Sequence, residues 1–223
     1  MTYRAPALIA GIILACALRG SPASAGVIRG HLRLSTPATT VSAVNAYPGR
    51  ASSMAMSKAM EHGAVADAVV WIEKVPTAAD TAAGGPRPRL AQKDQSFLPR
   101  VLPVAVGTSV DFPNLDPIFH NVFSASPVKR FDLGKYPRGQ SKRVIFDKAG
   151  LVNVYCDIHS GMEAFVLVLP THVFTQPANT GRYALPPVPG GTYTLHIWHP
   201  DRGEIRREVQ VPASGDVALD LEG

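Results

Sequence analysis

Cysteine and histidine are both scarce in this 223-residue chain, which contains two cysteines and seven histidines. Its longest apolar run, Pro6 to Leu18, is too short to cross a bilayer as a mature helix, and no transmembrane span is seen after it. Neither a nucleotide-binding loop nor a helical repeat is present. These absences direct attention to the short, chemically distinctive stretches that the chain does contain.

Residues 1–25 have the features of a secretory signal peptide. A short basic region is followed by the Pro6–Leu18 run and by Ala23-Ser24-Ala25, an A-x-A cleavage sequence. We therefore expect export to the periplasm, a mature chain that starts at Gly26, and no membrane span after cleavage. A lipid anchor on Cys16 is the alternative, although the three residues before it fit a lipobox poorly.

Removal of this segment would change both the net charge and the cysteine count. Arg4 and Arg19 would be lost without any acidic residue, so the net charge would fall from +5 to +3. This mild excess gives little reason to expect nucleic acid as a partner. Cys156 would be the only remaining thiol, which excludes an internal disulfide. Because a free thiol is oxidised in an oxidising compartment unless it is buried or ligated, Cys156 is either a metal ligand or a small core residue.

Short Val-rich runs separated by 20 prolines and 19 glycines predict an all-β fold. A mature chain of 198 residues is long enough for one or two domains with real cores. Residues 35–63 read as a long excursion and residues 76–90 as a linker. The predicted strands are Gly26–Leu34, Ala68–Val75, Phe97–Val106, Ser109–Phe112, Phe119–Phe123, Val144–Phe146, Leu151–Tyr155, Phe165–Leu169, Thr192–Trp198, Ile205–Val211 and Val217–Leu221.

The most informative stretch is LVNVYCDIHSGMEAFVLVLP, residues 151–170. Between its two strands, Cys156, His159 and Met162 follow one another at three-residue steps. Thiolate, imidazole and thioether on one short turn suit copper, which accepts soft sulfur as Cu(I) and imidazole in both oxidation states. The stretch therefore predicts most of a mononuclear copper site.

A blue-copper centre needs a second histidine in addition to these three ligands. His120, at the start of a hydrophobic strand and 36 residues before Cys156, is the candidate. A histidine at a strand end is often only a polar residue with satisfied hydrogen bonds, and that reading stays open. With His120 included, the ligand set for one Cu(I)/Cu(II) ion is His120, Cys156, His159 and Met162.

Over residues 97–170 the chain resembles the cupredoxins, the family of plastocyanin and amicyanin. The resemblance is carried by the FLPRVLPVAVGTSVDFPN segment, by His120-Asn121-Val122, and by Cys156-x2-His159-x2-Met162. It implies a Greek-key β-sandwich in which Asn121 braces the ligand loop near Asp157. Asp157 itself departs from the Ser or Thr that usually follows the cysteine in those proteins.

The whole mature chain resembles exported bacterial methylamine-utilisation-like proteins. In these, a cupredoxin is combined with a smaller carboxypeptidase-regulatory-like (transthyretin-like or Ig-like) β-sandwich. The matching residues are Gly181–Leu185 and Pro189–Leu195, with two strands near the N-terminus. The resemblance implies a discontinuous sandwich from residues 26–80 plus 172–223, with the cupredoxin domain, residues 91–171, inserted into it.

The expected function is one-electron transfer without a substrate, so the chain is predicted to be a carrier and not an enzyme. Electrons are expected to leave through the exposed edge of His159, with Ile118, Phe119 or Ile158 touching an unidentified redox protein. A basic run is a candidate docking site for an acidic partner, or else a solvated hairpin. Its basic residues are Lys129, Arg130, Lys135, Arg138, Lys142 and Arg143.

Two other functions remain open. The same loop could hold Cu(I) for copper carriage, with help from Met54, Met56 and Met60, or the chain could be a metal-free interaction module. Seven histidines are too few for the extra motifs of an oxidase with a trinuclear copper cluster. His196 and His199 lie three apart on a predicted strand and so face opposite sides, which favours an interface role over a second metal site.

Overall fold

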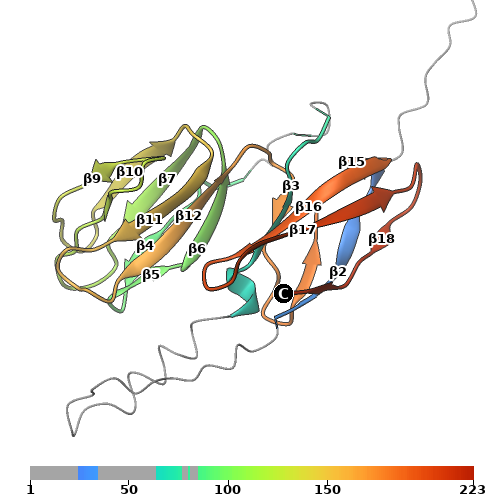
Figure 1. Cartoon of the computed structure of the whole chain (residues 1–223). Coiled ribbons are helices and arrows are strands. Elements are labelled where there is room, and N and C mark those ends of the chain that lie inside the picture. Colours follow the sequence, from blue (N-terminus) through green and yellow to red (C-terminus); the bar gives the residue numbers. More distant parts are fainter. Residues whose placement is uncertain (1–24, 35–63, 77–79, 81–84) are drawn as a thin grey trace, which may run out of the picture.

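The computed structural model describes residues 25–34, 64–76, 80 and 85–223. These residues form nineteen strands and one short 3-10 helix, Val65–Asp67, so the chain is all-β as predicted. The strands gather into two lobes that lie side by side (Figure 1). Residues 1–24 and 35–63, which include Cys16 and the Met54, Met56 and Met60 segment, lie outside the described residues.

The first lobe, residues 85–169, is called here the site lobe. Its largest sheet has the order β6-β12-β11-β8-β9, in which β6 and β12 are parallel. The pair β7–β10 packs across a common core from this sheet, and the hairpin β4–β5 lies beside it. The bounds are β4 Ala91–Lys93, β5 Ser96–Leu98, β6 Val101–Ala105, β7 Thr108–Pro113, β8 Phe123–Ser124, β9 Phe131–Asp132, β10 Ser141–Phe146, β11 Gly150–Tyr155 and β12 Glu163–Leu169.

The second lobe, called here the outer lobe, comprises residues 25–34, 64–76 and 170–223. A sheet of order β13-β3-β16-β17 packs against a sheet of order β14-β2-β18, with β19 also paired to β2 and β1 paired to β15. Between the two sheets lies an apolar core that includes Ile28, Ile72 and Leu195. The bounds are β1 Ala25–Gly26, β2 Ile28–Arg33, β3 Val69–Ile72, β13 Phe174–Thr175, β14 Arg182–Ala184, β15 Val188–Pro189, β16 Gly191–His199, β17 Gly203–Val211, β18 Val217–Ala218 and β19 Leu221–Glu222.

Strand β12 belongs to the core of the site lobe on one face and to the contact between the lobes on the other. Ala164, Val166 and Val168 enter the site-lobe core, whereas Leu167 and Leu169 pack in a separate cluster with residues of the outer lobe. Because side chains alternate along a strand, a strand covered on both faces has a continuous apolar sequence. This explains why residues 164–169 read as one unbroken hydrophobic run.

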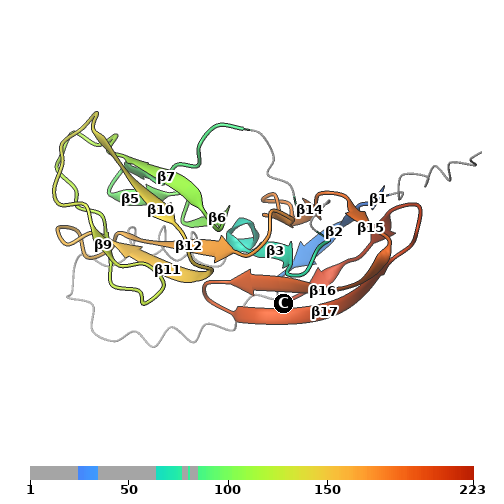
Figure 2. The same cartoon turned by 90° about the horizontal axis from the view of Figure 1, so that it is seen from above.

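The contact between the lobes combines aromatic packing with a partly buried cation. Trp198 of β16 packs edge-on against Phe165 of β12, with 6.0 Å between ring centroids. Arg100, just before β6, pairs with Asp67 and with Asp201 of the outer lobe at 3.0 Å each. Its guanidinium group also lies 5.3 Å from the Phe165 ring centroid. Figure 2 shows the two lobes from above.

Four predicted strands differ from the structure in more than their ends. Gly26–Leu34 is divided between β1 and β2, and Val217–Leu221 is divided between β18 and β19. Phe97–Val106 is divided between β5 and β6, and of Phe119–Phe123 only the last residue lies in a strand, β8. Phe119 is 56% exposed, and His120 pairs with Tyr136 as an isolated bridge. The apolar character of residues 119–123 therefore reflects an exposed aromatic followed by a short buried segment, and not one continuous strand.

Truncation of Trp198 should weaken the contact between the lobes. Trp198→Ala removes a 9%-exposed indole, so the free energy of unfolding should fall by about 3–5 kcal/mol. Urea titration followed by circular dichroism measures this change. Ile145→Ala is a control because Ile145 is 56% exposed, and it should stay within about 0.5 kcal/mol of the parent. A loss under about 1 kcal/mol for Trp198→Ala would contradict the interface role.

His199 should make the stability depend on pH. Burial lowers the pKa of His199 below its ordinary value of 6.5, although a hydrogen bond to the Ala64 carbonyl opposes this. Because the unfolded state then takes up a proton that the folded state resists, stability should fall as the pH drops below about 6.5. The same urea titrations at pH 7.5 and 5.5 measure the loss, which should be smaller in His199→Gln than in the parent. An equal loss of stability in the two proteins would contradict the assignment of this pH dependence to His199.

Candidate metal centre

The pairing of β11 with β12 creates the loop that carries three of the predicted ligands. Tyr155 pairs with Glu163 as the last rung of this hairpin, so Cys156 and Met162 leave the sheet at the same level. The Met162 N–H donates to the His159 carbonyl oxygen at 3.0 Å, which closes a tight turn between them. Cys156 and Met162 are both buried in the site-lobe core, at 6% and 1% exposure.

His120 approaches this loop from a different part of the lobe. Its N–H and carbonyl groups exchange hydrogen bonds with the Tyr136 backbone at 3.3 and 3.0 Å, which fixes the direction of the side chain. The imidazole is fully buried. The structure therefore brings His120 to Cys156 and His159, as the sequence predicts for a site completed by a distant segment.

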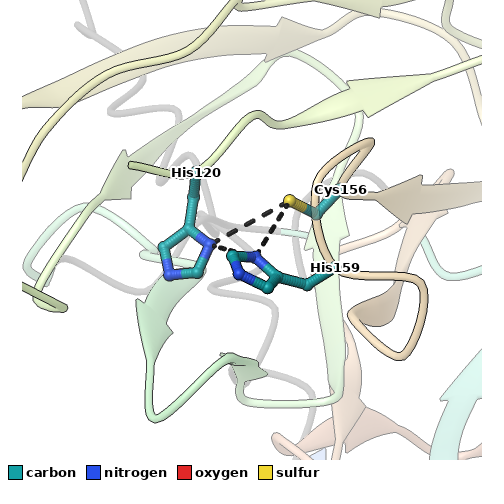
Figure 3. A group of neighbouring side chains, drawn as sticks. All are labelled: His120, Cys156 and His159. Atoms are coloured by element: carbon teal, nitrogen blue, oxygen red, sulfur yellow. Dashed lines mark hydrogen bonds between the residues drawn. The ribbon is translucent and has the colours of Figure 1, made fainter. Parts of the chain in front are cut away.

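The donor atoms of these three residues converge on one point (Figure 3). His120 Nδ1 lies 3.1 Å from His159 Nδ1, and Cys156 Sγ lies 4.0 and 3.9 Å from the same two nitrogens. Three ligands about 2.0–2.3 Å from a metal in one plane would lie roughly 3.5 Å apart. The observed separations surround this value, so the residues fit a small trigonal metal site.

The site is buried on most sides and partly open at one. His120 and Cys156 are buried, and His159 is only half-buried. Three large apolar side chains near it in the chain are exposed: Ile118 by 38%, Phe119 by 56% and Ile158 by 40%. Of the three residues, His159 is therefore the one most accessible to water.

Asp116 is a residue of the site that the sequence analysis missed. Its Oδ2 atom lies 2.7 Å from His120 Nε2, the ring nitrogen that points away from the other ligands. Burial would raise the pKa of Asp116, but the Gln95 N–H, the His120 ring and the Asp94 N–H together hold it below its ordinary value. An acidic residue four positions before a candidate ligand histidine is the only sequence feature that points to it.

The two residues predicted to support the ligands lie in different surroundings. Asn121 is buried, and its Oδ1 atom has no hydrogen-bond partner within the described part of the chain. Asp157 is exposed beside Cys156. The structure thus shows no bond from Asn121 Oδ1 to Asp157, and the bracing role of Asn121 stays a prediction.

A buried polar network lies behind His120. The Tyr136 hydroxyl group donates to the Phe112 carbonyl oxygen at 2.8 Å and accepts from Gln92 Nε2 at 2.6 Å. Burial raises the pKa of Tyr136 well above its ordinary range, so the hydroxyl keeps its proton at neutral pH. Asn114 Nδ2 in turn donates to the Tyr136 carbonyl oxygen at 2.9 Å. These bonds hold rigid the segment that pairs with His120.

The six basic residues of the predicted docking run divide into two groups. Lys129 pairs with Asp147 at 2.9 Å, Arg143 pairs with Asp111 at 2.7 Å, and Lys142 Nζ donates to the Leu133 carbonyl oxygen. The other three, Arg130, Lys135 and Arg138, are exposed and have no ion pair among the described residues.

No second metal cluster is found within the described residues, where His120, Cys156 and His159 form the single group of at least three candidate ligands. His196 Nδ1 lies 2.8 Å from Glu204, and its ring stacks on Trp71 at 4.8 Å. His199 Nε2 bonds to the Ala64 carbonyl oxygen at 3.2 Å. Both histidines therefore have structural partners. The described residues also include no helix long and apolar enough to cross a membrane.

No protein-family model and no curated protein matches the chain. Solved structures similar to part of it include the following three. A copper-containing nitrite reductase from Thermus scotoductus SA-01 has 26% identity over 41% of this chain and 25% of its own, with a TM-score of 0.36. A purple cupredoxin from Nitrosopumilus maritimus has 22% identity over 36% and 98%, with a TM-score of 0.34. A single-residue mutant of amicyanin in its Cu(I) form has 23% identity over 46% and 98%, with a TM-score of 0.35.

The chain thus spans about a quarter of the nitrite reductase and nearly all of the two cupredoxins. With every TM-score below 0.5, these likenesses say nothing further about function. The functional assignment below rests on the residues of the site.

Proposed function

We propose that this chain is an exported mononuclear type 1 copper protein that carries single electrons between redox proteins. The observation that carries the proposal is the convergence of Cys156 Sγ, His120 Nδ1 and His159 Nδ1 on one point within a β-sandwich. One thiolate and two imidazoles are the equatorial ligands of blue-copper centres. Met162, from the same loop, is proposed as the weak axial ligand.

Bound copper would supply one-electron chemistry by alternating between Cu(II) and Cu(I). The chain would do the rest through fixed positions: Cys156 and His120 are held in the buried interior, so little rearrangement would accompany the change of charge. No pocket for a substrate is needed in this scheme, and we propose a carrier and not an enzyme.

The half-buried edge of His159 is the proposed exit for the electron. The exposed side chains of Ile118, Phe119 and Ile158 are proposed as an apolar rim that would exclude water when a partner docks. A short distance and a dry contact are what a transient electron-transfer complex requires. The partner is proposed to be another redox protein, not a nucleic acid.

The basic residues with no ion pair within the described chain are the proposed docking charges. Lys135 and Arg138 flank Tyr136, whose backbone is bonded to His120, so they belong to the same end of the lobe as the site. A groove of about 470 Å³ is lined by Gly139, next to Arg138 in the chain, and by residues that include Arg87, Arg89 and Asp111. An acidic partner would be attracted to this region.

The same proposal includes the domain division and the location of the protein. We propose residues 91–171 as a cupredoxin domain and residues 26–80 plus 172–223 as a transthyretin-like sandwich, in keeping with two separate apolar cores. Export to the periplasm follows from residues 1–25, with a lipid anchor on Cys16 as the alternative. The role of Met54, Met56 and Met60 in copper carriage stays a prediction.

The visible spectrum after addition of Cu(II) tests the proposed function. The protein starting at Gly26 should show an intense blue thiolate-to-copper band that a reductant bleaches. Cys156→Ser should lose this band, and Ser160→Ala, in the same loop, should keep it. A colourless protein that binds Cu(I), with affinity lowered by Met54→Leu and Met56→Leu, would favour copper carriage instead. No binding of either ion, together with free reaction of Cys156 with thiol reagents, would favour a metal-free module.

Charge reversal near the site tests the docking proposal. The copper-loaded protein should exchange electrons with the hexacyanoferrate anion at a rate that falls with added salt. Lys135→Glu with Arg138→Glu should lower the rate at low salt by about tenfold. Arg182→Glu with Arg207→Glu changes the net charge equally on the outer lobe and should have little effect. Equal losses in the two double variants would show that only net charge matters.

A further inference from the structure

The carboxylate of Asp116 is buried and has a partner for each oxygen. Oδ1 accepts a hydrogen bond from the Asp94 N–H at 2.6 Å, and Oδ2 accepts from the Gln95 N–H at 2.9 Å. Oδ2 also lies 2.7 Å from His120 Nε2, and the side chain is 6% exposed. A charge removed from water in this way is destabilising unless it is paired and hydrogen-bonded. The fold has therefore assembled a dedicated cradle for one negative charge beside His120.

This contact determines which nitrogen of His120 carries the proton. Both oxygens of Asp116 already accept backbone N–H groups, so in the 2.7 Å contact the carboxylate is the acceptor and His120 Nε2 the donor. A neutral imidazole protonated at Nε2 has its free lone pair on Nδ1. That atom faces Cys156 Sγ and His159 Nδ1 (Figure 3). His120 is thereby ready to bind a metal before any metal arrives.

The cradle is formed by an unusual turn. Asp94 and Gln95 connect β4 to β5, and both have positive φ angles, 53° and 54°. Two-residue hairpins of this kind favour Asn-Gly or Asp-Gly, because a side chain such as glutamine is disfavoured at positive φ. Strained backbone of this sort tends to occur at functional sites. Here it points two consecutive N–H groups at Asp116.

The two histidines of the site differ in whether a carboxylate supports the ring. His120 is fully buried and tied to a carboxylate, whereas His159 is half-buried and its ring contacts among the described residues are with His120 and Cys156. A hydrogen-bonded carboxylate behind a ligand histidine fixes the ring and increases its basicity. Of the two site histidines, only His120 has such a carboxylate among the described residues.

We infer that Asp116 is a positioning residue of the metal site, which fixes His120 with Nδ1 toward the metal and places a carboxylate held by two backbone N–H groups behind it. The inference rests on the proposed function for the identity of the metal, but not for the state of His120 in the metal-free protein. The added charge should favour Cu(II) over Cu(I) and so lower the reduction potential. His120 is thus held more rigidly than His159, whose ring has no such carboxylate among the described residues.

The metal-free protein tests the inference directly. Nitrogen-15 NMR of the imidazoles at pH 8 should show His120 protonated at Nε2 and not at Nδ1. Asp116→Asn should give a mixture of the two tautomers, and Asp116→Glu, which keeps a carboxylate, should restore part of the preference. Asp132→Asn removes an exposed negative charge from the same lobe and should leave His120 unchanged. A parent protein with His120 protonated at Nδ1 would overturn the inference even if the variants failed to fold.

Copper binding gives a second measurement. Competition against a chelator should show the affinity of Asp116→Asn reduced by about 10–100-fold, with Asp132→Asn unchanged. The reduction potential of the loaded variant should rise. If Asp116→Asn kept the copper affinity, the reduction potential and the His120 tautomer of the parent, the positioning role would be refuted. If the parent bound no copper while the tautomer still shifted in Asp116→Asn, the proposed function would fail and the role of Asp116 in orienting His120 would stand.

Discussion

The register of the β11–β12 hairpin is the constraint on which the site depends. Because Tyr155 faces Glu163, Cys156 and Met162 emerge together at the end of the sheet, with His159 between them on a short loop. A shift by one residue would turn every side chain of the strand to the opposite face. If β11 shifted, Val152 and Val154 would then leave the core, so the packing that stabilises the lobe also fixes the candidate ligands.

The second requirement is a rigid approach for His120. Its backbone is tied to Tyr136, and Tyr136 is tied in turn to Phe112 and Gln92 by buried hydrogen bonds. The bonds in such a network resist being broken, because a broken bond leaves a polar atom buried. The loop and the distant histidine are thus held by two different means, apolar packing for one and polar bonding for the other.

The sequence predicts these two parts unequally. Cys156, His159 and Met162 lie within seven consecutive positions, so their spacing alone indicates a common site. His120 is a candidate only because the loop lacks a ligand. The all-β class follows from the pattern of proline, glycine and valine, whereas the break before β8 does not, since exposed Phe119 reads as a strand residue.

Asp116 lies beyond this kind of prediction for a physical reason. The Asn114–Pro117 segment has an ordinary turn composition, which explains an aspartate there without any further role. Its partners are backbone N–H groups of a hairpin more than twenty residues earlier, and backbone donors leave no mark in the sequence. The ion pairs of Arg100 are equally hard to predict from the sequence, because its two acidic partners come from widely separated segments.

Because β12 packs against both the site-lobe core and the outer lobe, separating the two lobes would expose apolar side chains. A chain cut down to residues 85–169 would keep every proposed ligand, but it would uncover Val101, Leu167 and Leu169, which now pack against the two tryptophans of the outer lobe. A contiguous apolar face of this kind promotes aggregation in water. The outer lobe therefore shields this apolar face of the site lobe from water, so the two lobes should be made and handled as one molecule.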